Sequence, residues 1–297
     1  MSHTIAQLRA DRRKDVLELV DRIKSADGLE PLSEYKSMRL DGRLDIREQI
    51  AALSDETVIG YGQAAWHRGA GEPGDGHWAI EITVVPEHRA SGVPEDLIDA
   101  LRNDLDDDAA VLWSRHDYVA DAALRCGWQK RRVLWEMRRS LPIDGLDMSL
   151  HGFRLASFRM GIDEKAWLEA NNATFAGHPE NGDMTRRDLE KRMAQPWFDP
   201  AGFFLAWDGE DLAGSCWTKV HESGLGEIYV IGVVPQWEGR GLGRALVAVG
   251  LDHLARVCHS REAMLFVESL NTRAVSLYES LGFEAVQSVE AYRYDSA

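Results

Sequence analysis

The sequence predicts an α/β protein built from two tandem domains of similar fold, and two observations lead to this. Strand-like segments alternate with helical ones, in an order that combines short hairpins with one strand–helix–strand step. In addition, the layout of residues 84–98 (VVPEHRASGVPEDLI) returns 149 residues later at 233–247 (VVPQWEGRGLGRALV). A repeat of about 150 residues indicates a duplicated domain, because solenoid repeats are only about 20–50 residues long.

The repeat extends beyond this loop and sets the expected domain boundaries. Three further pairs of segments match: 57–66 with 211–220, 77–86 with 226–235, and 121–140 with 274–293, the last pair sharing a glycine–aromatic step. The join lies near 141–152, which contains Pro142, Gly145 and Gly152. We therefore expect an N-terminal domain over 1–143 and a C-terminal domain over 150–297.

The elements of the second copy follow from its local patterns. Asp208-Gly209 between two apolar runs is a strong hairpin signal, and Thr185 followed by Asp188 is typical of a helix start. In chain order we expect a strand at 153–160, helices at 163–175 and 184–195, a hairpin around Asp208-Gly209, a strand at 226–234, a helix at about 242–257, a strand at 263–269, a helix at 271–282 and final strands to Tyr294.

Composition excludes several functional classes. The net charge of −15 argues against nucleic acid or an anionic membrane as a partner. No segment has the roughly 20 consecutive apolar residues that span a bilayer, and the N-terminus lacks the apolar core of a signal peptide. The three cysteines are far apart, without metal-ligand spacing: Cys126, Cys216 and Cys258. We expect a cytoplasmic protein that binds a small molecule and no metal; a monomer is one option, and the oligomeric state stays open.

The glycine-rich loop of the second copy is suited to binding phosphate. Gly239, Gly241 and Gly243 let backbone N–H groups approach a ligand closely at the start of a helix, where the helix dipole favours an anion. Arg240 and Arg244 add positive charge. The spacing is neither that of a P-loop nor that of a Rossmann fingerprint. By itself, the loop is equally compatible with a simple strand-to-helix turn.

This loop resembles the acetyl-CoA loop of the GCN5-related N-acetyltransferases, the GNAT family. A second signature of that family, an Asn that opens the next helix and is followed by Tyr and LGF, is present as NTRAVSLYESLGF at 271–283. The resemblance implies acetyl-CoA as cosubstrate, bound by the strand end, the loop and the helix start: Ile231, Gly232, Val233, Glu238, Gly239, Arg240, Gly241, Leu242, Gly243, Arg244, Asn271, Thr272, Arg273, Ala274, Val275 and Ser276. Glu238 stands where the family usually has Gln or Arg.

The resemblance also implies which residues move protons. Making an amide from a thioester needs a base for the amine proton and an acid for the departing thiolate. Glu227 falls at the family's general-base position, and Tyr278 at its general-acid position. From the residues alone, Glu227 could equally be a solvated strand-edge carboxylate and Tyr278 a packing residue. Gly232 could mark either a strand bulge or close packing.

Several stretches narrow the resemblance to two-domain members that acetylate the cysteinyl amine of a cysteine–glucosamine–inositol pseudodisaccharide. These stretches are 177–185, 192–207 and 217–221. Carried over by position, the substrate-binding residues would be Glu34, Glu180, Lys219, Glu227 and Phe266. Carboxylates suit the hydroxyl groups of sugar and inositol as hydrogen-bond acceptors. Phe266 stands where those proteins carry a Tyr, so its hydroxyl contact would be lost.

The first copy has lost the chemistry-bearing residues. Trp78 stands opposite Glu227, Ala123 opposite Tyr278, and Pro94, which has no N–H, falls within the loop. Gly92 and a helix start remain, so weak coenzyme binding stays open. We expect this domain not to catalyse and to supply one wall of the acceptor site.

Two other functions stay open at this point. The acceptor could be another small amine, such as a polyamine, an aminoglycoside or a peptide, because acidic pocket residues suit cationic amines in general. Alternatively, the chain could be a coenzyme-A-binding protein without activity, an interpretation that the presence of Glu227 and Tyr278 disfavours.

Overall fold

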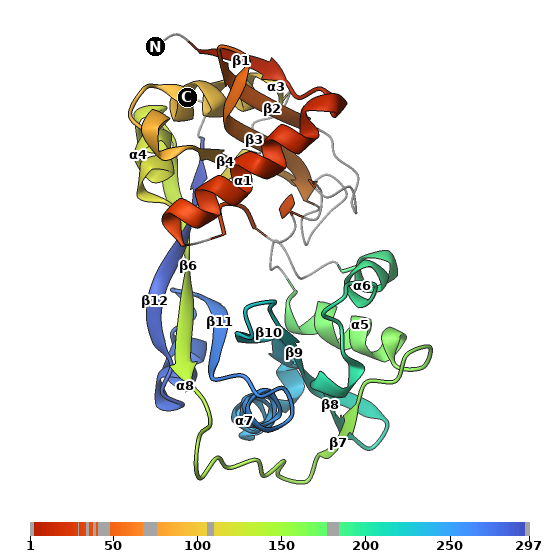
Figure 1. Cartoon of the computed structure of the whole chain (residues 1–297). Coiled ribbons are helices and arrows are strands. Elements are labelled where there is room, and N and C mark those ends of the chain that lie inside the picture. The colour runs from red at the N-terminus through yellow and green to blue at the C-terminus, as the bar shows by residue number, and fades with distance from the viewer. Residues whose placement is uncertain are drawn as a thin grey trace. The chain divides into compact units, whose positions relative to one another are not determined.

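The computed structural model describes residues 3–28, 30–33, 36–37, 40, 48–67, 76–105, 110–176 and 184–294 (Figure 1). These residues form two compact units. The first unit draws on Met1–His67, Gly76–Val133 and Val289–Ala297, and the second mainly on Leu134–Ser288. In the described ranges, no helix has both the length and the apolar character needed to cross a bilayer. The three cysteines are free.

The first unit contains a mostly antiparallel sheet. Its strands run in the order β1 (Thr4–Gln7), β2 (Glu48–Ser54), β3 (Thr57–His67), β4 (His77–Val84), β5 (Ala110–Ser114) and the end of β12 (Glu284–Arg293). Only β4 and β5 pair in parallel. A parallel pair needs a crossover connection, and α3 (Val93–Asp104), which lies between β4 and β5 in the chain, supplies it.

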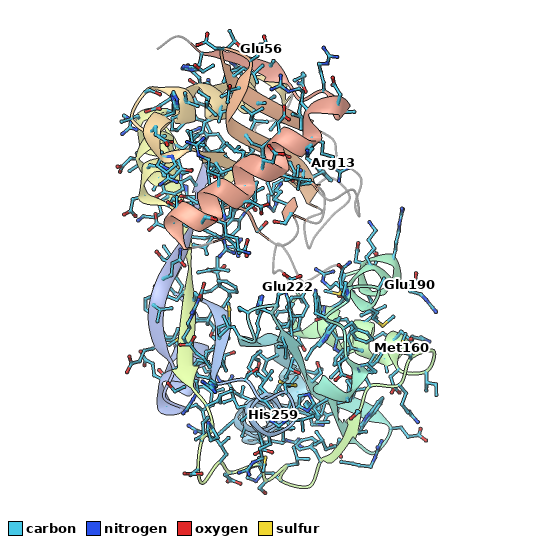
Figure 2. The ribbon with its side chains drawn as sticks, in the orientation of Figure 1. Arg13, Glu56, Met160, Glu190, Glu222 and His259 are labelled. Atoms are coloured by element: carbon cyan, nitrogen blue, oxygen red, sulfur yellow. The ribbon has the colours of Figure 1, made fainter. Side chains whose placement is uncertain are left out.

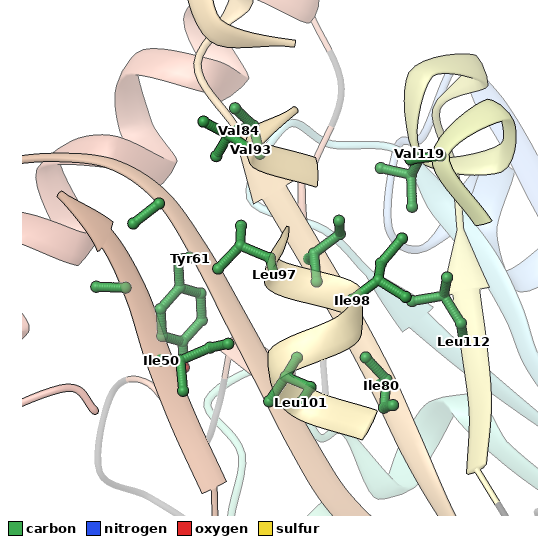
Figure 3. Close-up of a cluster of buried hydrophobic side chains, with 14 of the residues drawn as sticks. Ile50, Tyr61, Ile80, Val84, Val93, Leu97, Ile98, Leu101, Leu112 and Val119 are labelled. Carbon is green, nitrogen blue, oxygen red and sulfur yellow. The ribbon is translucent and has the colours of Figure 1, made fainter. Parts of the chain in front are cut away.

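The helices of the first unit are α1 (Arg13–Asp27), α3 (Val93–Asp104) and α4 (Asp117–Arg125). Figure 3 shows how α3 packs on the sheet: Leu97 and Leu101 point from the helix towards Tyr61 and Ile50, and Val93 appears beside Val84. All six side chains are almost completely buried. This spacing of apolar residues, three or four apart along α3, matches one face of a helix.

The second unit repeats this arrangement. Its strands run in the order β7 (Arg154–Ser157), β8 (Phe203–Asp208), β9 (Asp211–Val220), β10 (Gly226–Val233), β11 (Glu262–Glu268) and β6 (Gln129–Ser140). The β10–β11 pair is parallel, whereas the β7–β8, β8–β9, β9–β10 and β6–β11 pairs are antiparallel. The helix α7 (Leu242–Arg256) forms the crossover between β10 and β11.

Helices cover both faces of the second sheet. On one face lies α7, where Gly250 packs so closely that an added Cβ would stand 2.7 Å from the Cys216 sulfur. On the other face lie α5 (Glu164–Thr174) and α6 (Arg186–Met193), over an aromatic cluster centred on Trp217. Trp217 stacks on Phe203 with ring centroids 4.4 Å apart. The remaining helix, α8 (Thr272–Ser280), joins the α7 side through Tyr278.

The two units exchange their last strands. The strand β6 follows α4 of the first unit, yet it pairs with β11 from Glu262↔Ser140 to Glu268↔Leu134. In turn β12 follows α8, yet its end pairs with β5 from Glu290↔Ser114 to Arg293↔Val111. Each sheet is therefore completed by a strand from the other half of the chain.

The structure confirms the predicted α/β class and most elements of the second copy. The hairpin turns at Gly209, whose φ is +62°, and Thr185 and Asp188 form a capping box at the start of α6. One detail differs: the expected final strands are the single strand β12. A long strand without a turn results because no glycine or proline interrupts residues 284–293.

Because β6 pairs with β11, we predict that a fragment comprising 150–297 does not fold by itself. Without β6, the edge of β11 loses its hydrogen-bond partners, and an unpaired strand edge promotes aggregation. A fragment of residues 129–297, which retains β6, is the matched control and should be soluble. Circular dichroism and urea unfolding distinguish the two. Cooperative unfolding of the 150–297 fragment would contradict the prediction.

Candidate active site

The strand β10 parts from β11 soon after it begins. Their parallel pairing consists of Gly226↔Ala263 and Glu227↔Met264, whereas β10 pairs with β9 along its whole length, to Val233. Beyond Glu227, none of the described strands pairs with the edge of β10 that faces β11. Backbone N–H and C=O groups without a partner are strong hydrogen-bonding groups, so this edge can bind an extended ligand carrying amides.

A bulge helps to bend β10 at this point. The register with β9 passes from Ile228↔Thr218 to Val230↔Trp217, which leaves Tyr229 as the extra residue. A bulge increases strand twist and re-aims side chains. Gly232 is not the bulged residue. It lies against α5, where an added Cβ would stand 2.7 Å from Thr174 Cγ2, so close packing accounts for this glycine.

The glycine loop leads from β10 into α7 as the sequence predicts. Gly239 and Gly241 have φ values of +76° and +81°, which favour glycine. Gly241 is the N-cap of α7 and no acidic residue occupies the first turn, so the helix N-terminus retains its positive potential. Leu242 is buried in the core and Gly243 lies beside Val233. Arg244, in the first turn, bonds to Ser280 of α8.

The unexpected Glu238 has a partner in the second family signature. Its carboxylate forms an ion pair with Arg273 in the first turn of α8. Both side chains are substantially exposed, so the pair contributes little to stability. It does neutralise the carboxylate beside the loop and connects the loop with α8. Arg240 faces Asp208 at 4.0 Å, and Asp208 also accepts from Trp237 Nε1 at 2.9 Å.

The start of α8 is held by Asn271. Its side-chain oxygen accepts from the N–H of Ala274 at 3.1 Å, which makes it the N-cap. Thr272 and Ser276 are exposed on the first turns, and Val275 is buried. The Asn of the family signature therefore has a structural role in this chain, whatever it contacts in a ligand.

Three ionisable side chains gather on one face of the β9–β10 hairpin. Glu227 stands directly opposite Lys219, and His221 follows two residues later on the same face, because side chains alternate along a strand. Glu227 Oε2 lies 2.8 Å from His221 Nε2 and 3.9 Å from Lys219 Nζ. The Glu227 and Lys219 side chains are only 8% and 6% exposed. Glu227 is thus not a solvated strand-edge carboxylate.

Aromatic rings hold the ammonium group of Lys219 in place. Its Nζ lies 4.9 Å from the centre of the Trp197 ring and 5.5 Å from that of Tyr229, the bulged residue of β10. Rings attract a cation through their negative faces. Arg192 of α6 bonds to the Tyr229 hydroxyl at 3.2 Å.

Tyr278 approaches from the opposite face of the sheet. It is buried with Leu265, Val267 and Phe283 on the side covered by α7. Burial raises the pKa of the Tyr278 hydroxyl well above its ordinary value, and the nearby Cys216 adds to this. The hydroxyl accordingly keeps its proton at neutral pH, as a general acid must.

The proposed acceptor residues are only partly described. Phe266 lies on β11 two residues after Met264, which places it on the same face as Glu227. Glu34 and Glu180 lie outside the described residues. Ser33, the neighbour of Glu34, donates from its N–H to the buried Glu81 of β4 at 2.7 Å.

Sequence reasoning missed His221. The segment 217–221 drew attention as a whole, but no role was assigned to its histidine. The pattern that could have indicated this role is Lys219-x-His221 at the end of one strand, which places both side chains on one face, opposite Glu227 near the start of the next strand. In the part of the chain that the structure describes, there is no group of three His, Cys, Asp or Glu residues able to hold a metal.

The counterpart of this site in the first unit is built differently. Val84, which precedes Pro86 as Val233 precedes Pro235, donates its N–H to the Tyr118 hydroxyl at 3.0 Å. Its carbonyl oxygen accepts from Arg89 Nε, also at 3.0 Å. The first turn of α3 contains Pro94 and two acidic residues, Glu95 and Asp96. An acidic first turn opposes the binding of phosphate there.

Comparison with solved structures supports the tandem architecture. A GCN5-related N-acetyltransferase from Sphaerobacter thermophilus matches with a TM-score of 0.71 and 22% identity, over 98% of this chain and 95% of that one. A tandem GNAT protein from the clavulanic acid biosynthesis pathway matches with a TM-score of 0.71 and 14% identity, over all of both chains. At these identities the likeness concerns the fold alone.

Sequence comparison gives the family. The acetyltransferase (GNAT) family model matches residues 165–283. A mycothiol acetyltransferase from Geodermatophilus obscurus is 43% identical over 283 residues, covering 90% of this chain and 89% of that protein. Another from Catenulispora acidiphila is 40% identical over 306 residues, covering 94% and 95%. With such relatives along nearly its whole length, the chain belongs to the mycothiol acetyltransferases, within the GNAT acetyltransferases.

Proposed function

We propose that this protein transfers the acetyl group of acetyl-CoA to the cysteinyl amine of cysteinyl-glucosaminyl-inositol, giving mycothiol. The observation that carries the proposal is that one strand, β10, starts at the buried pair Glu227–Lys219 and leads into the glycine loop at the N-terminus of α7. The relatives named mycothiol acetyltransferase supply the identity of the acceptor.

The coenzyme would lie along the free edge of β10. Its pantetheine amides would pair with the backbone of Ile231–Val233, beyond the last β10–β11 residue pair. Its pyrophosphate would contact the N–H groups of Gly239–Arg244 at the start of α7. Arg240 and Arg244 supply positive charge, and the ion pair of Glu238 with Arg273 removes an unfavourable negative charge.

Glu227 would act as the general base, directly or through a water molecule. An α-amine has a reference pKa of roughly 7.7–8.0, so most of it is protonated at pH 7 and must lose a proton before it attacks. The Lys219 ammonium group, with Nζ 3.9 Å from Glu227 Oε2, lies beside the carboxylate that would accept this proton. The tetrahedral intermediate then collapses and releases the coenzyme thiolate.

Tyr278 would protonate that thiolate, and the second proton lost by the attacking nitrogen would restore the tyrosine hydroxyl. It comes from the face of the sheet opposite to Glu227, so base and acid would flank the substrates where β10 and β11 have parted. Lys219, Glu227 and Phe266 would line the acceptor site, together with Glu34 and Glu180.

We also propose that the first unit does not catalyse. Trp78 is the second residue of β4, as Glu227 is the second residue of β10, and Ala123 on α4 is a buried methyl group. The N–H of Val84 is already bonded to Tyr118. The proposed base, acid and coenzyme edge of the second unit therefore have no working counterpart there.

The acceptor is tested by thiol release from acetyl-CoA with three amines: cysteinyl-glucosaminyl-inositol, spermine and an aminoglycoside. We expect kcat/KM for the pseudodisaccharide to exceed the others by at least about 10³-fold, since a site built for polar groups rejects ligands that leave them unpaired. A comparable or higher kcat/KM for spermine or the aminoglycoside would contradict the proposed substrate.

Substituting Glu227→Gln should lower kcat by about 10²- to 10⁴-fold, the usual contribution of a general base. The dissociation constant of acetyl-CoA should stay close to the wild-type value, because Glu227 is not part of the glycine loop. Steady-state kinetics and calorimetry measure the two quantities. Turnover near the wild-type rate from about pH 6 to 9, the range over which the amine titrates, would show that Glu227 is not the general base. The base would then have to be sought elsewhere, the first unit included.

Substituting Tyr278→Phe should keep the fold, because the ring packing on Phe283 is retained, and should lower kcat by about 10²-fold. An acetyl thioester of an acidic aromatic thiol is the matched control, since its thiolate leaves without protonation. The defect should largely disappear with that donor. An equal defect with both donors would show that the hydroxyl does not act as the acid.

A further inference from the structure

His221 is fixed at the end of the β9–β10 hairpin. Its backbone N–H donates to the Leu225 carbonyl at 2.9 Å, and its carbonyl accepts from Gly224 at 2.8 Å. Gly224 has a φ of +83°, so the tight turn depends on glycine at this position. The backbone therefore holds the imidazole at a defined place beside the first residues of β10.

The imidazole connects the buried carboxylate with solvent. His221 Nε2 lies 2.8 Å from Glu227 Oε2, and its side chain is 32% exposed, whereas that of Glu227 is 8% exposed. Lys219 Nζ also lies nearest to Oε2, so both contacts go to the same carboxylate oxygen.

The inference rests on the proposed function, because acetyl transfer to an amine requires a route for protons from Glu227 to solvent. A protonated amine and acetyl-CoA give an amide, a thiol and one proton, so each turnover releases one proton to solvent. Glu227 accepts that proton in a buried position. The carboxylate must lose it again before the next acceptor can be deprotonated.

Lys219 cannot remove this proton. A charged ammonium group has three donors and no acceptor. The side chain is 6% exposed and its Nζ lies over the Trp197 and Tyr229 rings, whose faces attract a cation. Imidazole differs because a neutral ring has both a donor and an acceptor nitrogen, so it can accept a proton on one nitrogen and release a proton from the other.

We propose that His221 is the proton outlet of Glu227 and also positions its carboxylate. The proton moves from Glu227 Oε2 to Nε2 of the neutral imidazole, and the ring releases the proton on Nδ1 to water. Loss of the Nδ1 proton leaves a neutral ring whose Nε2–H donates to the ionised carboxylate and positions it, and exchange with solvent returns the Nδ1–H tautomer before the next transfer. The carboxylate is again ionised, and no oxidant or further reactant is needed.

The first variant is His221→Ala, which removes both functions. We expect kcat with saturating substrates to fall by about tenfold or more, at an unchanged KM for acetyl-CoA, because the loop is not touched. Added imidazole should restore part of the lost rate with a saturable dependence on its concentration, since a small buffer can carry the proton. A structural defect would not respond to imidazole.

The second variant separates the two functions. The Gln side chain in His221→Gln keeps an N–H that can bond to Glu227, but its amide nitrogen cannot accept a proton and pass one on to water. We expect this variant to remain slow and to gain rate with imidazole. The matched control is Glu222→Gln, the next residue in the turn, whose side chain is labelled in Figure 2. It should behave as the wild type.

The outcomes are distinct from those that test the base. If Glu227→Gln is inactive while His221→Ala turns over at the wild-type rate, the outlet is wrong and the base assignment stands. A His221→Gln variant that turns over at the wild-type rate and does not respond to imidazole would also overturn proton transfer through His221. Slow variants that imidazole accelerates, alongside an inactive Glu227→Gln that imidazole does not rescue, support the proposal.

Discussion

The early end of the β10–β11 pairing is the constraint on which the proposed site depends. Two residue pairs hold the strands together, and beyond them no described strand pairs with that edge of β10. The bulge at Tyr229 and the packing of α5 on Gly232 accompany this divergence. The proposed coenzyme edge and the proposed proton-transfer groups, Glu227 and Tyr278 on opposite faces of the sheet, both require the two strands to part here.

The first unit shows that a short parallel pairing is not enough to leave the backbone groups of a strand end open to a ligand. In the first unit β4 and β5 also pair over only three residue pairs, yet Tyr118 and Arg89 occupy the backbone groups of Val84 at the strand end. The strand end is therefore internally bonded in the first unit, whereas in the second unit the described β10–β11 pairing ends at Glu227. The exchange of β6 and β12 nevertheless keeps both units necessary for a complete pair of sheets.

Much of this could be predicted from sequence because it is local. The hairpin at Gly209, the capping box of Thr185 and the loop glycines depend on residues a few positions apart. The strand exchange could not be predicted, because the sequence of β6 indicates a strand without indicating its partner. The Glu238–Arg273 ion pair joins residues 35 positions apart, and the contact of His221 with Glu227 depends on the exact hairpin register.

The most direct test of the account is a structure of the protein with acetyl-CoA bound. We predict pantetheine between β10 and β11, with its amides bonded to the backbone of 231–233 and its pyrophosphate at the N-terminus of α7. The sulfur should lie between Glu227 and Tyr278. Coenzyme bound elsewhere in the second unit, with that edge of β10 still unpaired, would contradict the central claim.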